Sequence, residues 1–403
     1  MIINQKQNII IPSHTNNALN VKNFDNNIIG SFVIKEREKD NFKIIRDLSG
    51  SRKIFMGKKN KQQFFSSNFI DLKNLGCKLK SIKSFERGTV TRINFKGKLI
   101  SKKNIKQKEV IKFNKGFHKK IEKKISLFLK EIKKKYGNSC YVCLSGGLDS
   151  TLIAFFAKKI FKNVVLLTAY EKDKGKKSSD LKHASQVARK LKLKHTKIPF
   201  DLKKQLKDLK KIMYASQDWR DYNIHCAFLN FAIAKYIDKN LKKLPVLTGD
   251  MMNEFFADYD SEIFKGETFY NIPNVEKKIR QRFFIRSLDS SDREIGIFNF
   301  FKIPLFQPYS VVVSDYENIP KKIINKKRAK YIVNGKFIPN SLLKLVLKKK
   351  NRAQITDDGG GILSFFLRNM INQKKLNSLF KAYFKIDQKF LRQFINIGSY
   401  RHF

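Results

Sequence analysis

The sequence predicts a two-part α/β protein in which a short antiparallel β unit precedes a larger domain built on a parallel sheet. Between residues 28 and 100, β-branched and aromatic runs such as TVTRINFKGKLI are separated by turn residues, which is typical of antiparallel strands. From Gly116 onward, apolar positions at helical spacing alternate with short apolar runs. This alternation predicts parallel strands with helices on both faces. Beyond about residue 260 the pattern is mainly helical.

The elements of the larger domain follow one another along the chain. The strands that we expect are Cys140–Leu144, Val164–Thr168, His195–Pro199 and Pro245–Thr248. The helices that we expect are His118–Tyr136, Thr151–Phe161, Asp180–Leu191 and Tyr222–Ile237. The polar, charged segment 101–115 is expected to be a linker. The expected domain organisation is therefore an N-terminal extension at 1–27, the β unit at 28–100, the linker, and the second domain at 116–403.

Composition excludes several classes of protein. The chain has 403 residues, of which 42% are hydrophobic, so it can bury a core and is not a disordered chain. No apolar run reaches the roughly 18 residues that a membrane-spanning helix needs. The first residues lack the order of a signal peptide, and the four cysteines are too few for a disulfide framework. We therefore expect a cytoplasmic protein with no membrane partner.

The net charge of +51 comes from 85 Lys and Arg against 34 Asp and Glu. Most of the excess is lysine scattered along the whole chain, whereas a nucleic-acid footprint would be clustered and rich in arginine. We interpret the charge as background that helps to bind a polyanionic substrate, and we do not expect a nucleic-acid partner. An exposed edge of the short β unit would allow a second copy to pair there as a homodimer.

The most informative segment is Ser145-Gly146-Gly147-Leu148-Asp149-Ser150, between an expected strand and an expected helix. The glycines let the backbone turn sharply and present N–H groups to phosphate oxygens, and the serines add hydroxyl donors beside the helix N-terminus. An aspartate beside polyphosphate is explained if it holds Mg²⁺ between itself and the phosphates. The alternative interpretation is an ordinary helix-capping turn. The segment is neither a Walker A motif nor a dinucleotide fingerprint.

These residues resemble the PP-loop of the ATP pyrophosphatases, and downstream landmarks resemble the asparagine synthetase and β-lactam synthetase family within that superfamily. The landmarks are the segments SDLKHA at 179–184, TGDMMNEFFADY at 248–259, DRE at 292–294 followed by FNFFKIPLFQPY, and KNRAQ at 350–354 with GGG at 359–361. They occur in the family's order over more than half of the chain. The resemblance implies that residues 116–403 form a PP-loop synthetase domain with a helical C-terminal part.

The resemblance implies a ligase that adenylates a substrate carboxylate, releases pyrophosphate, and transfers the acyl group to ammonia or an amine, with ATP and Mg²⁺. For ATP and pyrophosphate it implies Leu144, Ser145, Gly146, Gly147, Asp149, Ser150, Leu166, Thr168 and Gly249. For the metal it implies Asp149 and Asn253. Asp250 and Glu254 are candidate acid–base residues, although both could simply cap a helix. Lys350, Arg352 and Arg293 are the candidate cations for the reacting phosphates.

The chain departs from the family pattern at several of these positions. Asn253 stands where the family has a metal-binding aspartate, so the site loses one negative charge. Met251, Met252, Ala257 and Asp258 replace family glycines, which predicts a bulkier wall facing the substrate. The segment 217–223 with His225 is dense in polar and aromatic residues, and it either lines the substrate pocket or packs and caps the next helix.

The β unit resembles the tail of the family's glutaminase domain, an Ntn-hydrolase, with Asp47-Leu48-Ser49-Gly50 at a matching landmark. The family's glutaminase uses a cysteine exposed after removal of the initiator methionine, but position 2 here is Ile2. Without that thiol there is no nucleophile for glutamine. We therefore expect a truncated, inactive remnant.

Two other functions stay open from the sequence. A PP-loop enzyme that modifies tRNA would give the positive charge a purpose, but no RNA-binding appendage is visible. A catalytically degenerate nucleotide-binding protein would account for Asn253 and the altered glycines, but it would not need the intact SGGLDS segment.

Overall fold

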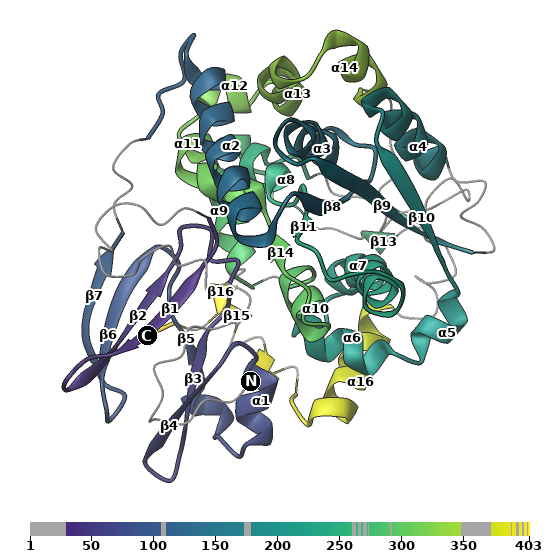
Figure 1. Ribbon diagram of the computed structural model, residues 1–403. Coiled ribbons are helices and arrows are strands. Elements are labelled where there is room, and N and C mark those ends of the chain that lie inside the picture. The colour runs from purple at the N-terminus through teal and green to yellow at the C-terminus, as the bar shows by residue number, and fades with distance from the viewer. Residues whose placement is uncertain are drawn as a thin grey trace.

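The computed structural model describes residues 30–105, 110–172, 179–259, 263–264, 267–268, 272, 274–290, 292–347, 372–387, 389–391, 395–396, 399–400 and 402–403. Within these residues, antiparallel sheets form one lobe and a parallel sheet covered by helices forms the other (Figure 1). The predicted α/β class, with an N-terminal antiparallel part and a parallel-sheet domain, is confirmed. No helix of the described residues is long and apolar enough to cross a membrane.

The N-terminal lobe contains two antiparallel sheets within the described residues. One has the order β1-β2-β6-β7, and the other has the order β4-β3-β5. Their strands are β1 (Val33–Arg37), β2 (Asn41–Arg46), β3 (Phe55–Lys59), β4 (Gln62–Ser66), β5 (Lys83–Ser84), β6 (Thr89–Asn94) and β7 (Leu99–Asn104), and helix α1 (Phe69–Asn74) follows β4. A buried cluster between the sheets includes Phe42, Phe65 and Phe85. The likeness of this lobe to a glutaminase domain stays a prediction.

Strand β7 extends into the segment that we expected to be a linker. It pairs with β6 as far as Asn104 opposite Thr89. Its residues are largely exposed, and lysine side chains are common on exposed edge strands because they discourage pairing with another chain. Leu99 and Ile100 belong to a run that the sequence analysis assigns to strands, but residues 101–104 show no alternation of apolar and polar residues, so the sequence does not indicate how far the strand continues.

Five strands of the described residues form the parallel sheet, in the order β10-β9-β8-β11-β14. They are β8 (Ser139–Cys143), β9 (Asn163–Glu171), β10 (Lys194–Phe200), β11 (Val246–Leu247) and β14 (Leu305–Phe306). The first four match the strands expected from the sequence. The two-residue strand β14 is too short to produce a periodic signal of its own.

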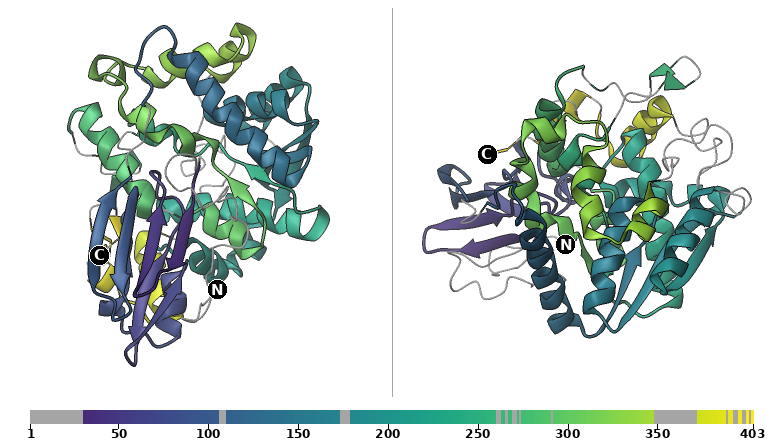
Figure 2. Two further views of the ribbon diagram at one scale, coloured as in Figure 1. Left: turned by 60° about the vertical axis from the view of Figure 1, so that its left-hand side comes forward. Right: turned by 90° about the horizontal axis from the view of Figure 1, so that it is seen from above.

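Helices cover both faces of this sheet (Figure 2). Cys140 and Val142 point into one core with α2 (Phe117–Tyr136), α3 (Leu148–Ile160) and α4 (Ser179–Leu191). Tyr141 points into the other core with α6 (Leu209–Ser216), α7 (Asp221–Asn240) and α10 (Ile295–Phe300). The alternation along β8 is what a two-faced strand requires. Further helices of the second part are α5 (Leu202–Leu206), α8 (Met252–Phe256), α9 (Lys277–Ser287), α11 (Val313–Glu317), α12 (Lys321–Ile324), α13 (Ala329–Asn334), α14 (Asn340–Val346) and α16 (Gln373–Phe384).

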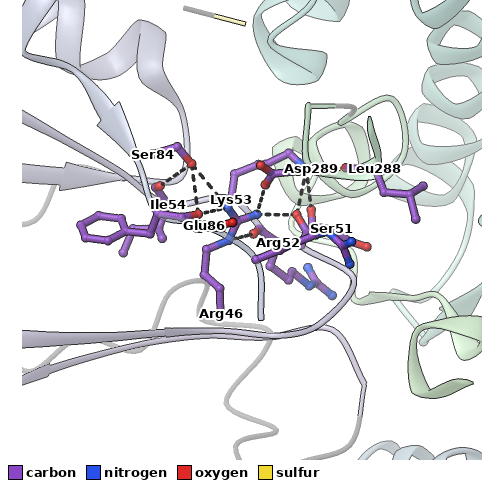
Figure 3. A network of polar contacts seen from close by, with 12 residues as sticks. Arg46, Ser51, Arg52, Lys53, Ile54, Ser84, Glu86, Leu288 and Asp289 are labelled. Atoms are coloured by element: carbon purple, nitrogen blue, oxygen red, sulfur yellow. Dashed lines mark hydrogen bonds and ion pairs between the residues drawn. The ribbon is translucent and has the colours of Figure 1, made fainter. Parts of the chain in front are cut away.

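A buried polar network joins the two lobes (Figure 3). The Arg46 Nη2 atom lies 2.6 Å from Asp289 Oδ1, and both side chains are at most 1% exposed. His402 Nε2 lies 2.9 Å from Asp289 Oδ2. Lys53 donates from Nζ to the backbone oxygens of Ser51 at 3.1 Å and Leu288 at 3.2 Å. The lobes are therefore joined through desolvated, hydrogen-bonded charges.

Candidate functional site

The SGGLDS segment is a tight turn between β8 and α3. Gly146 has φ +79°, in the left-handed region, and a Cβ there would lie 2.9 Å from the backbone nitrogen of Ala184. The Ser145 N–H donates to Ser150 Oγ at 3.1 Å, and the two serine hydroxyls lie 3.0 Å apart. Glycine is thus needed both for the turn and for the close approach of α4, and the serines hold the turn closed.

The segment after β11 presses against this turn. A Cβ on Gly249 would lie 2.6 Å from Ser150 N and 2.7 Å from the carbonyl carbon of Asp149. On the other side, the Tyr309 hydroxyl donates to the backbone oxygen of Asp149 at 2.9 Å. These contacts put the 248–259 segment and the SGGLDS turn, the candidate phosphate loop, into one site. Tyr309 was not among the residues predicted from the sequence.

Lys330, on α13, is a central residue that the sequence did not indicate. Its Nζ donates to Asn253 Oδ1 at 2.8 Å and to Asp149 Oδ2 at 3.2 Å, and it lies 3.2 Å from Asp258 Oδ2. Lys330 is buried. Burial opposes the charged ammonium, but the carboxylates of Asp149 and Asp258 outweigh it and raise the pKa of Lys330 above its ordinary value. The lysine therefore stays charged beside the phosphate loop.

The donor set around Lys330 suits a hard cation. Two carboxylates and an amide oxygen converge on one point, and Mg²⁺ binds oxygen ligands of this kind. In the structure the ammonium group of Lys330 occupies that point and pairs with both carboxylates. No group of three or more His, Cys, Asp or Glu side chains able to hold a metal occurs among the described residues. The predicted metal residues Asp149 and Asn253 are thus brought together by a lysine.

A second charged cluster lies next to this one and joins three of the predicted catalytic residues. The Arg293 Nη2 atom donates to Asp250 Oδ1 at 2.8 Å and lies 3.7 Å from Glu254 Oε1. The Tyr259 hydroxyl donates to Glu254 at 2.7 Å. Burial, followed by the charge of Asp250, raises the pKa of Glu254 to about 7. Such a carboxylate is suited to exchange protons near neutral pH.

Glu294, the last residue of the DRE segment at 292–294, extends the cluster. Its Oε2 accepts from Thr248 Oγ1 at 2.7 Å and from Gln307 Nε2 at 2.9 Å. Burial, followed by the charge of Asp250, raises the pKa of Glu294 to about 8. Asp292 turns the other way, toward the N-terminal lobe, and accepts from Gln217 Nε2 at 2.9 Å.

Of the residues expected near adenine, Leu144 directly follows β8, and Leu166 and Thr168 lie within β9. Thr168 Oγ1 donates to the Leu144 backbone oxygen at 2.6 Å, and His195 Nε2 lies 2.9 Å from the same hydroxyl. Leu166 is fully buried in the core, in a strand that pairs with both β8 and β10. An adenine site there stays a prediction. Lys350 and Arg352 lie outside the described residues.

Residues 138–293, less than half of the chain, match the asparagine synthase family model. This segment carries the phosphate loop, the 248–259 segment and Arg293, so the PP-loop synthetase resemblance is confirmed for it. No curated protein matches the chain with a significant score.

Several solved structures overlap with the chain at low similarity. The NMN synthetase from Francisella tularensis is 15% identical, with a TM-score of 0.27 over 64% of this chain and 95% of that one. The NH3-dependent NAD synthetase from Campylobacter jejuni is 16% identical, with a TM-score of 0.26 over 66% and 96%. The U34-tRNA thiolase NcsA from Methanococcus maripaludis is 13% identical, with a TM-score of 0.30 over 69% and 79%.

Proposed function

We propose that the protein is an ATP-dependent ligase that adenylates a substrate carboxylate, releases pyrophosphate, and passes the acyl group to an amine or ammonia. The observation that carries the proposal is the contact of Gly249 with Asp149 and Ser150. It brings the SGGLDS turn next to the segment that carries Asp250 and Glu254, which supports one site for phosphate binding and proton transfer. Adenylation needs a phosphate-binding turn, and amide formation needs a carboxylate that accepts a proton. The match to the asparagine synthase family supports the same chemistry.

In the first step the substrate carboxylate attacks the α-phosphorus of ATP and pyrophosphate leaves. Backbone N–H groups of the turn and the hydroxyls of Ser145 and Ser150 bind the departing phosphates. Lys330 offsets negative charge as it develops on pyrophosphate. When Mg²⁺ is bound, the oxygens of Asp149 and Asn253 would hold it, and the ion would neutralise part of the polyphosphate charge.

In the second step a neutral amine attacks the acyl carbon of the adenylate, and AMP leaves with the bonding electron pair. The nitrogen must lose a proton as the amide forms. Glu254 and Glu294 have pKa values raised to about 7 and about 8, so either can accept a proton near neutral pH. Arg293 holds Asp250 in place at 2.8 Å and offsets the charge of the cluster.

We expect no glutaminase activity. The chain has four cysteines, Cys77, Cys140, Cys143 and Cys226. Cys77, in the N-terminal lobe, is buried, and burial raises the pKa of its thiol. A thiol of this kind is a poor nucleophile, so the lobe supplies no cysteine suited to attack glutamine.

Nucleotide product analysis tests the proposal. Purified protein, MgATP, ammonium and a panel of carboxylic acids should give AMP and pyrophosphate with one acid, and glutamine should not replace ammonium. Asp149→Asn should abolish the signal, whereas Asp238→Asn, at a surface ion pair with Lys243, should leave it intact. ADP and phosphate as the products, or AMP formation unaffected by Asp149→Asn, would overturn the proposal.

A further inference from the structure

A cavity of about 190 Å³ lies between the N-terminal lobe and the parallel-sheet part. Its walls include Arg52 and Lys53 from the first lobe and Gln217, Asp292 and Asn299 from the second. We call it the interface cavity. An apolar cavity of about 150 Å³ can take up benzene, so this space is large enough for a small metabolite.

Arg52 gives the interface cavity an anion-binding group. Its side chain is buried, and Nη2 donates to the Leu305 backbone oxygen at 2.6 Å. No described residue accepts a hydrogen bond from its Nε or Nη1. Because a buried guanidinium with unused donors is costly, these two N–H groups are suited to a ligand with anionic oxygens. A carboxylate matches the planar fork of an arginine in geometry and charge.

Lys53 reinforces the positive charge beside Arg52. It is 4% exposed, and its Nζ donates to backbone oxygens rather than to a carboxylate (Figure 3). Asp292 also lines the cavity, but its two oxygens already accept from Gln217 Nε2 and from the Gly296 N–H. In this part of the wall, the unused hydrogen-bonding groups are therefore the N–H donors of a positively charged side chain.

A second, much smaller cavity lies between the interface cavity and the acidic cluster, and we call it the neck cavity. It shares Asp292 and Ile295 with the interface cavity, and its other walls include Asp250, Arg293 and Glu294. Its volume of about 10 Å³ is close to the least that holds one water molecule. Only a group as small as an amine fits there beside Asp250 and Glu294.

We propose that the interface cavity binds the acceptor substrate, a small primary amine that carries a carboxylate, such as an amino acid. The carboxylate of the acceptor pairs with Arg52, and its amine enters the neck cavity beside Asp250 and Glu294. This inference rests on the proposed function and names the class of its second substrate. In the reaction the amine nitrogen bonds to the acyl carbon, the acyl–AMP bond breaks, AMP leaves, and a carboxylate of the cluster takes the proton.

The test on the unmodified protein compares matched amines, once product analysis has identified the acid. Glycine is compared with methylamine, β-alanine with ethylamine, and both pairs with ammonium. Since a hydrogen bond to a charged group is worth enough to change binding by about 10- to 100-fold, the carboxylate-bearing amines should have kcat/KM higher by that factor. Equal values within each pair, or a preference for ammonium, would overturn the inference and make the cavity a passage for ammonia.

The variant Arg52→Gln tests the assigned residue. It should raise KM for the preferred amino acid by about 10- to 100-fold with a smaller change in kcat, and Arg52→Lys should restore part of the affinity. Arg92→Gln, at a half-exposed pair with Glu38, is the matched control. An unchanged KM in Arg52→Gln would contradict the inference. If Arg52→Gln fails to fold, the matched amines decide.

ATP–pyrophosphate exchange separates this inference from the proposed function. Exchange reports the first step, which needs no acceptor. Absence of exchange in the unmodified protein with every acid would mean that the proposed function itself fails. Exchange with one acid, but no selectivity for carboxylate-bearing amines, would overturn only the inference about the interface cavity and leave the proposed function standing.

Discussion

Lys330 joins three side chains from two separate parts of the chain at a single ammonium group. Asp149 belongs to the start of α3, Asn253 to α8, and Asp258 to the segment that follows α8. Removing one partner of a buried ion pair leaves an uncompensated charge and is strongly destabilising. The lysine therefore acts on the geometry of the phosphate loop as well as on its charge.

Replacing Lys330 should separate its effect on the charge of the phosphate loop from its effect on the loop's geometry. Lys330→Met removes the cation and should lower ATP–pyrophosphate exchange by about 100-fold, while Lys330→Arg should retain a measurable part of it. Lys326→Met, at an exposed position near the same helix, is the control. Thermal unfolding shows whether each variant is folded. Normal exchange in a folded Lys330→Met protein would mean that the lysine is only structural.

A substitution at Gly249 tests the contact between the 248–259 segment and the phosphate loop. Because an alanine Cβ would lie 2.6 Å from Ser150 N, Gly249→Ala must displace the phosphate loop. We expect KM for ATP to rise at least about tenfold and stability to fall by about 1–3 kcal/mol. Gly116→Ala, where the nearest atom to the new methyl would be 3.4 Å away, should change neither quantity appreciably. ATP binding unaltered by Gly249→Ala would refute the close approach.

Helices α8 and α10 each have a buried carboxyl group whose negative charge neighbouring cations do not fully neutralise. Glu254 lies in α8, and Glu294 is the residue before α10. Burial raises their pKa values from an ordinary 4.5 to about 7 and about 8. The folded state therefore keeps protons that the unfolded state releases as pH rises from about 4.5 to 8.

The sign of this effect predicts how stability depends on pH. The contribution of these carboxyl groups is fully present below about pH 4.5 and is lost as pH rises through 7 to 8. The loss should reach on the order of 3–5 kcal/mol for each group. Urea unfolding at several pH values should show Glu294→Gln gaining stability relative to the unmodified protein as pH rises. Glu122→Gln, at a surface pair with Lys159, should show no such trend, and a flat difference for Glu294→Gln would contradict the assigned environment.

Periodic elements could be predicted from the sequence, and short or one-sided elements could not. Strands β8, β9 and β10 and helices α2, α3, α4 and α7 lie within a few residues of their predicted positions, because buried faces impose a regular apolar pattern. Strand β14 has two residues and β7 is an exposed edge, so neither has such a pattern. Their places are decided by pairing with neighbouring strands.

The candidate site was predictable only where a motif carries chemistry. SGGLDS and the 248–259 segment have unusual residues at fixed spacing, whereas Lys330 is one lysine in a chain with 85 Lys and Arg. It lies 77 positions beyond Asn253, on a helix of six residues. Arg52 and the interface cavity depend on contact between two lobes, which local sequence patterns do not encode.

Across the whole molecule, the contact of Arg46 with Asp289 makes the two lobes depend on each other. Burial raises the cost of charging Asp289, but Arg46 and His402 outweigh it and hold the pKa of Asp289 well below its usual range. The stabilisation is therefore present above about pH 4 and is lost as pH falls further. A single buried pair of this kind can decide whether the lobes unfold together.

Asp289→Asn should lower the free energy of unfolding by about 3–5 kcal/mol, because it leaves Arg46 buried without its counter-charge. Urea unfolding followed by Trp219 fluorescence and by circular dichroism measures this loss. Separate transitions from the two signals would show that the lobes come apart first. Asp40→Asn, at an exposed turn of the N-terminal lobe, is the control. Unchanged stability in Asp289→Asn would contradict the assigned role of the pair.

The most direct test of the central claim is isotope transfer from the substrate carboxylate. The acid identified by product analysis is labelled with ¹⁸O in its carboxyl group, and AMP is recovered after turnover with MgATP and an amine. Adenylation predicts one ¹⁸O atom in AMP, because the carboxylate oxygen that attacked the α-phosphorus leaves with it. Label in inorganic phosphate, or no label in any nucleotide product, would contradict an acyl-adenylate and with it the proposed function.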